Sequence, residues 1–201
     1  MSNDFNHMNR RQLVAVFGSS ALLGVAMNRL LPAAAQTTTG TTTTTGTTTA
    51  TGTSTTSGDA ISDLIQDHRQ IQALMNQIAQ TSNPTQRTQL LQQLANLLTV
   101  HNSSEENYIY PAIRDIANLP NDAQTLYTQQ DTAKVILFQL DQLSKSAPNW
   151  GTLFATFRAA VNAHVAQEEN VDFPRLRQIA GTARLNQITT EFRQLRSHWR
   201  F

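Results

Sequence analysis

Two eleven-residue stretches, HNSSEENYIYP at residues 101–111 and HVAQEENVDFP at residues 164–174, share one pattern. Each has a histidine, three residues, Glu-Glu-Asn, two residues, an aromatic residue and a proline. The histidine and the first glutamate are four positions apart, which places both side chains on one face of an α-helix. The repeat therefore predicts two helices that each present a histidine and a carboxylate on the same face.

Apolar residues around these stretches recur at every third or fourth position, which is the period of an amphipathic helix. Short loops that contain Pro and Asn separate the periodic segments, and no segment alternates with period two. This pattern predicts an all-α fold, an antiparallel up-down-up-down four-helix bundle. We expect a short fifth helix across one end of the bundle. The apolar stripes of the five expected helices run over residues 61–78, 90–108, 126–143, 154–171 and 185–199.

The repeated histidines and glutamates lie on the apolar faces of their helices, and His68 lies in the middle of the stripe of the first helix. An unpaired carboxylate among apolar side chains is costly, so these groups need compensation. A cation between them provides it, because imidazole nitrogen and carboxylate oxygen bind iron, manganese and zinc. The sequence thus predicts a metal site made of His68, His101, Glu105, His164 and Glu168.

This arrangement resembles the hemerythrin family, specifically its HHE cation-binding branch. The resemblance covers about residues 59–177 and rests on the histidine in DHRQI at residues 67–71 and on the doubled His-x3-Glu with its trailing proline. It implies a non-heme iron site with one or two ions inside the bundle, with manganese or zinc as alternatives. It also implies that His68, His101 and His164 are terminal ligands and that Glu105 and Glu168 are bridging ligands.

The third helix departs from the family pattern, because no histidine lies between His101 and His164. Two residues are candidates to replace it. Counting along the repeat selects Asp131, whereas the hydrophobic face selects Gln130, whose apolar followers match those of His68. The face is the better guide, because one residue gained in a loop changes the count and leaves the face unchanged. We expect Gln130 to point inward as a weak neutral ligand, and the second ion position stays open.

The aromatic residues and prolines of the repeat are expected to have structural roles. Tyr110 and Phe173 are interpreted as core or rim residues, although a tyrosine near iron can donate a hydrogen bond. Pro111 and Pro174 are expected to kink or end their helices. His198 lies beside the stripe of the fifth helix and is expected at the surface.

The composition excludes several classes of site. The chain of 201 residues has no cysteine, so disulfides, thiolate nucleophiles and Fe–S clusters are ruled out. Without residues 1–35 the chain has 12 basic and 13 acidic residues. A chain so close to neutral lacks the basic surface that binds nucleic acid, so no nucleic-acid partner is expected.

The N-terminus is typical of a targeting segment. Residues 1–35 resemble a twin-arginine signal peptide, with Arg10-Arg11, an apolar stretch and a small-residue run that ends at Ala35. Cleavage after Ala35 predicts export to the periplasm or the extracellular space, with no stable membrane insertion. A retained membrane anchor is the alternative, but the apolar stretch is shorter than the roughly 20 residues of a span.

The sequence therefore divides into three parts. Residues 36–58 are rich in Thr and Gly without a large apolar residue, which is typical of a disordered linker. Residues 59–201 are expected to form the bundle. Its function is expected to be binding of O2 or NO at iron, or iron handling. The alternatives are an iron-dependent oxidase or peroxide-scavenging enzyme, and a structural bundle with a degenerate site; the sequence favours a binding protein over an enzyme.

Overall fold

The computed structural model describes residues 58–199, which form helices and turns with no β-strand in that range. The predicted signal peptide, residues 1–35, lies outside the described residues, and so does the predicted linker apart from Gly58. The all-α fold expected from the apolar period is confirmed. Among residues 58–199, no helix combines the length and the apolar character needed to cross a lipid bilayer.

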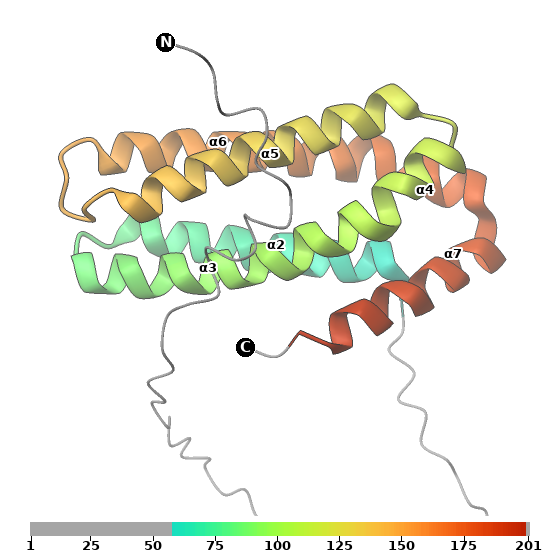
Figure 1. Cartoon of the computed structure of the whole chain (residues 1–201), viewed down its shortest axis with the longest axis horizontal. Coiled ribbons are helices and arrows are strands. Elements are labelled where there is room, and N and C mark those ends of the chain that lie inside the picture. Colours follow the sequence, from blue (N-terminus) through green and yellow to red (C-terminus); the bar gives the residue numbers. More distant parts are fainter. Residues whose placement is uncertain (1–57, 200–201) are drawn as a thin grey trace, which may run out of the picture. The chain divides into compact units, whose positions relative to one another are not determined.

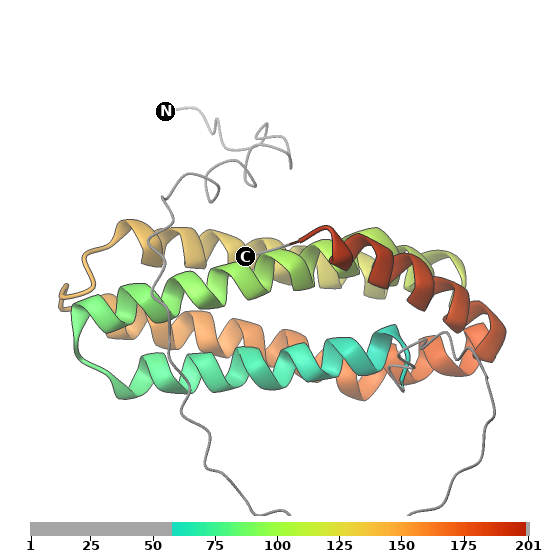
Figure 2. The ribbon, with the colours of Figure 1, turned by 90° about the horizontal axis from the view of Figure 1, so that it is seen from below.

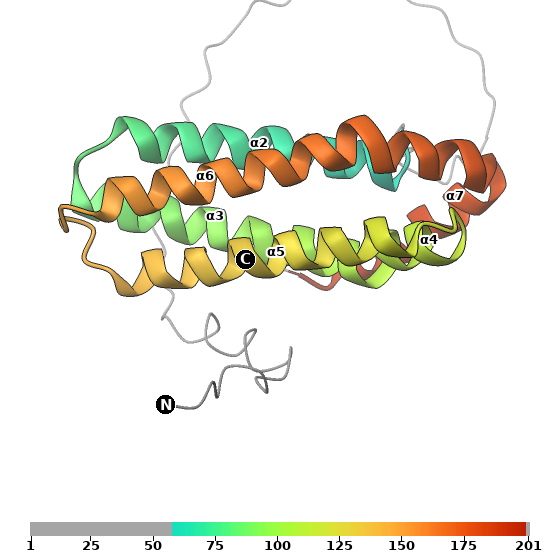
Figure 3. The same cartoon turned by 90° about the horizontal axis from the view of Figure 1, so that it is seen from above.

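The long helical segments lie side by side (Figure 1). The chain turns back between successive segments, and α2 packs along α3 as α5 packs along α6 (Figures 1 and 3). Two of the segments contain a short π-helical turn, η2 or η3. The elements are α2 (Ala60–Gln80), α3 (Pro84–Ser104), η2 (Glu105–Ile109), α4 (Tyr110–Asp115), α5 (Pro120–Gln142), α6 (Trp150–Gln167), η3 (Glu168–Asp172) and α7 (Phe173–Ser197).

Local side-chain chemistry explains where the first two helices begin. Asp59 caps α2, because its Oδ1 accepts a hydrogen bond from the Ser62 N–H at 2.8 Å. Asn83 caps α3 in the same way by accepting from the Gln86 N–H at 3.1 Å, and Pro84 occupies the first turn. Both side chains satisfy backbone donors that the helix itself leaves unpaired.

The interior consists of two apolar clusters with a layer of buried polar residues between them. On α2, His68 lies between Leu64 of one cluster and Ile71 of the other. Apolar packing on both sides keeps this layer away from solvent. The inward-facing polar residues of the layer are His68, His101, Glu105, Gln130, His164 and Glu168, each at most 6% exposed.

The last helix folds back over the bundle. Gly181 interrupts α7 with φ +66° and ψ 169°, a conformation that essentially only glycine adopts. The segment after Gly181 (red in Figure 2) returns along the bundle, and α7 packs against α2 and α3. Leu185, Ile188 and Phe192 are buried there, so the predicted fifth helix is the second half of α7. It lies along the bundle instead of across one end, because the chain reverses at Gly181 (Figure 2). His198 is exposed, as expected.

Candidate metal centre

Four of the five predicted ligands meet at one point inside the bundle. His68, His101, Glu105 and Glu168 each offer a donor atom that lies within 4.8 Å of the other three. None of the four side chains is more than 2% exposed. Donors bound at about 2.1 Å from one ion lie at most about 4.2 Å apart. A small contraction of the cluster would therefore let all four donors touch a single cation.

Three atoms of this cluster are buried polar atoms that have no hydrogen-bond partner in residues 58–199, namely His68 Nε2, Glu105 Oε1 and Glu168 Oε2. His68 Nε2 lies 3.2 Å from Glu168 Oε2, but without the angles of a hydrogen bond. Each such unpaired atom costs about 1–3 kcal/mol. A bound cation would remove this cost for all three at once, so the donors present fit a metal ion.

Each histidine of the layer is held from outside through its Nδ1 atom. A side-chain oxygen faces every one of these nitrogens, which assigns the ring proton to Nδ1 and leaves the lone pair on Nε2 for a metal. Oxygen partners of this kind orient metal-binding histidines and raise their basicity. The pairs are His68 with Glu169 Oε1 at 2.8 Å, His101 with Asp67 Oδ2 at 3.4 Å and His164 with Gln129 Oε1 at 3.0 Å.

Burial keeps the central carboxyl groups neutral when no cation is present. Burial raises the pKa of Glu105 to about 8, and the nearby charge of Glu168 contributes. Burial also raises the pKa of Glu168 to about 8. Conversely, burial lowers the pKa of His164 to about 3, assisted by the charges of His101 and His68. A cation between the carboxylates favours their charged forms, so metal binding at neutral pH would release protons.

His164, the fifth predicted ligand, lies at the edge of the layer. Its Nε2 atom is 3.4 Å from Glu168 Oε1 and 3.1 Å from the hydroxyl oxygen of Tyr110. It does not belong to the group of four whose donor atoms lie within 4.8 Å of one another. The structure therefore brings His164 to the carboxylates on a different side from His68.

The third helix contributes Gln130 to the layer. This side chain is 2% exposed, and its Nε2 lies 2.5 Å from Glu105 Oε2 and 2.7 Å from the Tyr110 hydroxyl. Asp131, the alternative found by counting, is exposed. The inward orientation of Gln130 that the hydrophobic face predicts is confirmed.

A π-helical turn follows each repeated histidine. The Tyr110 N–H donates to the Glu105 carbonyl and the Phe173 N–H to the Glu168 carbonyl, five residues back. Such turns are frequent at functional sites. The prolines after them, Pro111 and Pro174, do not end their helices; they occupy the first turn of the α-helix that continues.

Residues besides the predicted ligands contact the site, among them Tyr110, Asp67 and Glu169. Tyr110 is a core residue, as the sequence predicts, and it also fulfils the alternative of a hydrogen-bonding tyrosine. Its hydroxyl bonds to both glutamates, at 3.1 Å from Glu105 Oε2 and 2.9 Å from Glu168 Oε1. Asp67 and Glu169 hold histidines from outside. Their positions in the sequence indicate this role, because Asp67 directly precedes His68 and Glu169 directly follows Glu168.

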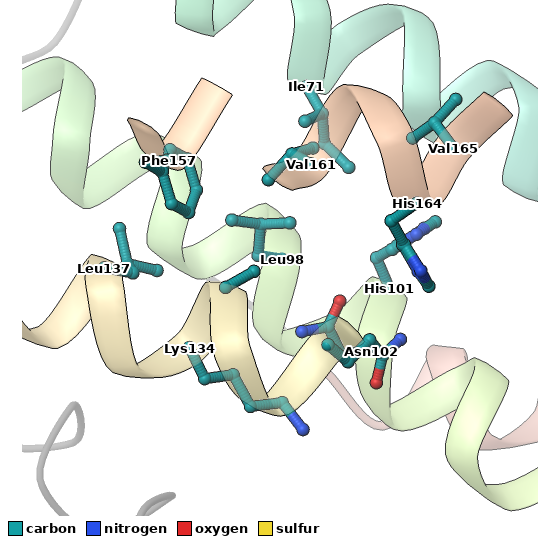
Figure 4. Close-up of a pocket in the computed structure, with 12 residues that line it drawn as sticks. Ile71, Leu98, His101, Asn102, Lys134, Leu137, Phe157, Val161, His164 and Val165 are labelled. Atoms are coloured by element: carbon teal, nitrogen blue, oxygen red, sulfur yellow. The ribbon is translucent and has the colours of Figure 1, made fainter. Parts of the chain in front are cut away.

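A small cavity opens beside the cluster and has a volume of about 30 Å³. Its polar lining residues are His101, Asn102, Gln130, Lys134 and His164. His101 and His164 lie on the same side of it (Figure 4). Its other walls are apolar, and its space exceeds the roughly 15 Å³ that one water requires. The cavity is therefore large enough for a diatomic molecule. The apolar lining residues are Ile71, Leu98, Ala133, Leu137, Phe157, Val161 and Val165.

Comparison with known proteins places the chain in a family. Residues 59–176 match the Hemerythrin HHE cation binding domain. A protein named DNA nickase from Nostoc sp. (strain PCC 7120 / SAG 25.82 / UTEX 2576) is 30% identical over 138 residues, which is 68% of this chain. The chain spans 39% of that relative's length.

A solved structure shares the fold. It is the crystal structure of a Hemerythrin HHE cation binding domain-containing protein, the Rv2633c homolog from Mycobacterium kansasii, with a TM-score of 0.60 and 22% identity. The match covers 70% of this chain and 89% of that chain. With the domain match over more than half of the sequence, the chain belongs to the hemerythrin HHE cation-binding family.

Proposed function

We propose that this chain is an exported non-heme iron protein that binds a small apolar ligand such as O2 or NO. The observation that carries the proposal is the apolar cavity that touches the donor cluster at His101. A site for a charged or large substrate would need polar walls or more space. A cavity of about 30 Å³ with mainly aliphatic and aromatic walls instead selects small, uncharged molecules.

The four clustered side chains would hold the iron. Two histidine nitrogens and two carboxylate oxygens form the mixed donor set of non-heme iron sites, which leaves coordination positions open for a ligand. When bound, the iron would supply the position at which the diatomic molecule attaches. Apolar side chains form most of the cavity wall. Glu169 and Asp67 keep the rings of His68 and His101 in place.

Export is part of the same proposal. It is supported by the twin-arginine-type segment over residues 1–35. Expression of the full chain with separate recovery of the periplasm tests it. We expect a mature protein that begins at Gln36; recovery of uncleaved protein from the cytoplasm or the membrane would contradict export.

Iron binding is tested by loading the metal-free protein with ferrous iron without oxygen, desalting it and measuring iron per chain. We expect bound iron in the wild type and its loss in Glu105→Ala, which removes a central donor. Glu106→Ala is the matched control, because this carboxylate pairs with Lys134. A wild type that retains no iron after desalting would refute the proposal.

Ligand binding is tested with NO and the ferrous protein by visible absorption. Val161 is 4% exposed and lines the cavity, so Val161→Phe should fill it and weaken NO binding by at least tenfold while iron is retained. Val135→Phe, at a position 55% exposed, is the control for the added ring. Unchanged NO affinity in a folded Val161→Phe protein would show that the cavity does not serve the iron.

A further inference from the structure

The metal centre has two corresponding halves, one built from α2 and α3 and the other from α5 and α6. In the two repeated stretches, His101 corresponds to His164 and Glu105 corresponds to Glu168. Outer contacts extend the correspondence to the preceding helices, because Asp67 accepts from His101 and Gln129 faces His164 in the same way. The residues that follow these two partners, His68 and Gln130, therefore occupy equivalent inward positions on α2 and α5.

The two halves differ in the residues at these inward positions and at the aromatic position of the repeat. The first difference is His68 against Gln130. The second is Phe173, beside His68, against Tyr110, whose side chain lies beside His164. Of these two aromatic residues, the tyrosine carries a hydroxyl group and the phenylalanine does not. Phe173 stacks on the His68 ring, with centroids 6.0 Å apart and planes at 5°. Tyr110 reaches the other side of the centre, where its hydroxyl makes hydrogen bonds beside His164.

The hydroxyl oxygen of Tyr110 is surrounded by four polar atoms on the side of the centre where His164 lies. They are Gln130 Nε2 at 2.7 Å, Glu168 Oε1 at 2.9 Å, Glu105 Oε2 at 3.1 Å and His164 Nε2 at 3.1 Å. Three of these four are the kinds of atom that would bind a second ion. The hydroxyl thus stands where such an ion would have to sit.

The two glutamates divide their oxygens between the halves. Glu105 Oε2 and Glu168 Oε1 bond to Tyr110, and Glu105 Oε2 also accepts from Gln130. Glu105 Oε1 and Glu168 Oε2, on the side of His101 and His68, lack a hydrogen-bond partner in the described part of the chain. On the side of His164 both carboxylate oxygens have partners, although Gln130 Oε1 has none. On the side of His68 both carboxylate oxygens and His68 Nε2 lack a partner among the described residues.

We propose that Tyr110 and Gln130 fill the second ion position and that this chain binds a single ion, on the side of His68 and His101. The inference rests on the proposed iron binding. The amide N–H groups of Gln130 face the carboxylate in place of a cation, and the neutral Gln129 raises the basicity of His164 less than Asp67 raises that of His101. His164 is then a partner of Tyr110 rather than a ligand of the bound ion.

The experiment measures iron per chain in the full-length protein loaded with excess ferrous iron and desalted. We expect one iron in the wild type and two in the double variant Tyr110→Phe/Gln130→His, which gives the side of His164 the same pair of residue types, histidine and phenylalanine, that His68 and Phe173 form on the other side. Asp131→His is the control, because it adds a histidine one position away, at an exposed site, and should stay at one. Circular dichroism confirms that each variant is folded.

The oxidised proteins give an independent reading by electron paramagnetic resonance. An isolated ferric ion gives a signal, whereas a pair coupled through bridging carboxylates is silent at its ground state. We expect the signal in the wild type and its decrease in the double variant. Single replacements add a test that does not need the double variant: His164→Ala should retain the ion and His68→Ala should lose it.

Each outcome decides between the two proposals. No bound iron in the wild type overturns the proposed function itself. Two irons in the wild type, or loss of iron in His164→Ala, leave iron binding intact and overturn the single-ion inference. A folded double variant that still binds one iron would show that Tyr110 and Gln130 are not what closes the second position.

Discussion

Arg196 holds Asp67 with two hydrogen bonds, 2.6 Å from Nη1 to Oδ2 and 3.0 Å from Nη2 to Oδ1. The same carboxylate faces Nδ1 of His101 at 3.4 Å. Burial opposes ionisation of Asp67, but the hydrogen bonds from His101 and Arg196 outweigh it and keep its pKa below the usual value. Arg196 on α7 therefore fixes the charged carboxylate of Asp67, and this carboxylate orients His101, a candidate ligand on α3.

Asp67→Asn should weaken iron binding by about 10–100-fold, the usual effect of losing an outer partner of a metal-binding histidine. Competition with a chelator of known affinity measures the change. Asp63→Asn is the matched control, because Asp63 makes a similar ion pair with Arg193 between α2 and α7 but does not contact a ligand. Equal losses in the two variants would assign the effect to helix docking instead of to His101.

Gly181→Ala should destabilise the fold by about 1–3 kcal/mol, because φ +66° with ψ 169° is strained for any side chain. A Cβ at this position meets no atom within 4 Å, so backbone strain is the only cost. Urea unfolding gives the difference in free energy. Gly151→Ala also has open space but no positive φ, and it should be neutral or slightly stabilising; equal destabilisation in both would contradict the strain argument.

The metal-free protein should lose stability as pH rises from 6.5 to 8. In this window the unfolded chain has ionised carboxyl groups, whereas Glu105 and Glu168 keep their protons in the folded protein because burial raises each pKa to about 8. The folded state binds more protons than the unfolded state, so its stability falls with pH. His164 is neutral in the folded protein because burial lowers its pKa to about 3, whereas in the unfolded chain about half of it is protonated at pH 6.5. Its titration therefore offsets part of the loss near pH 6.5, where two carboxyl groups act against one imidazole, and almost none of it near pH 8.

Thermal unfolding of the metal-free and iron-loaded proteins at pH 6.5, 7.2 and 8 measures this dependence. Iron should flatten the curve, because a cation favours the charged carboxylates. The double variant Glu105→Gln/Glu168→Gln should also flatten it without metal. A metal-free protein equally stable at pH 6.5 and 8 would show that the two groups are already ionised.

Asp59 should stabilise the fold in a way that disappears in acid. It caps α2 and bonds to Arg177 at 2.7 and 2.9 Å. Burial raises its pKa, but the hydrogen bonds from Arg177 and Ser62 outweigh burial and lower the pKa to about 2. A lowered pKa contributes stability above about pH 4, and this contribution is lost as pH falls toward 2.

Asp59→Ala should therefore cost about 1–2 kcal/mol at pH 7, as loss of a cap usually does. Urea unfolding at pH 7, 4 and 3 should show the deficit shrinking in the acid range. Asp59→Asn keeps a capping side chain and should lose less at pH 7. A deficit that is the same at all three pH values would mean that the charge of Asp59 contributes nothing.

The sequence predicts the helices and the inward residues well because both follow from apolar periodicity. Gln130 shows this most clearly. Its four apolar followers fix its orientation regardless of loop length, and the structure buries it while Asp131 stays exposed. Helix starts at Asn83 and Pro84 are equally local and follow from capping chemistry.

The role of Tyr110 could not be derived from the same period. In a regular α-helix, residues five apart point about 140° away from each other, so Tyr110 would face away from Glu105. The π-turn brings both to the same centre. Likewise, Arg196 reaches Asp67 only because α7 folds back at Gly181. No local sequence pattern specifies which residues of the bundle a reversed helix contacts.

The π-helical turns η2 and η3 also determine the direction in which the side chains of the following helices, α4 and α7, point. Removing one residue from η2 would restore a regular helix with no hydrogen bond lost, yet it would rotate the following turns by about 100°. The phenol would then swing out of the centre, and a neighbouring side chain would take its place. The one extra residue in each π-turn thus determines which of the following side chains point into the metal centre. The chemistry of the centre could change by insertion or deletion there without replacement of any ligand.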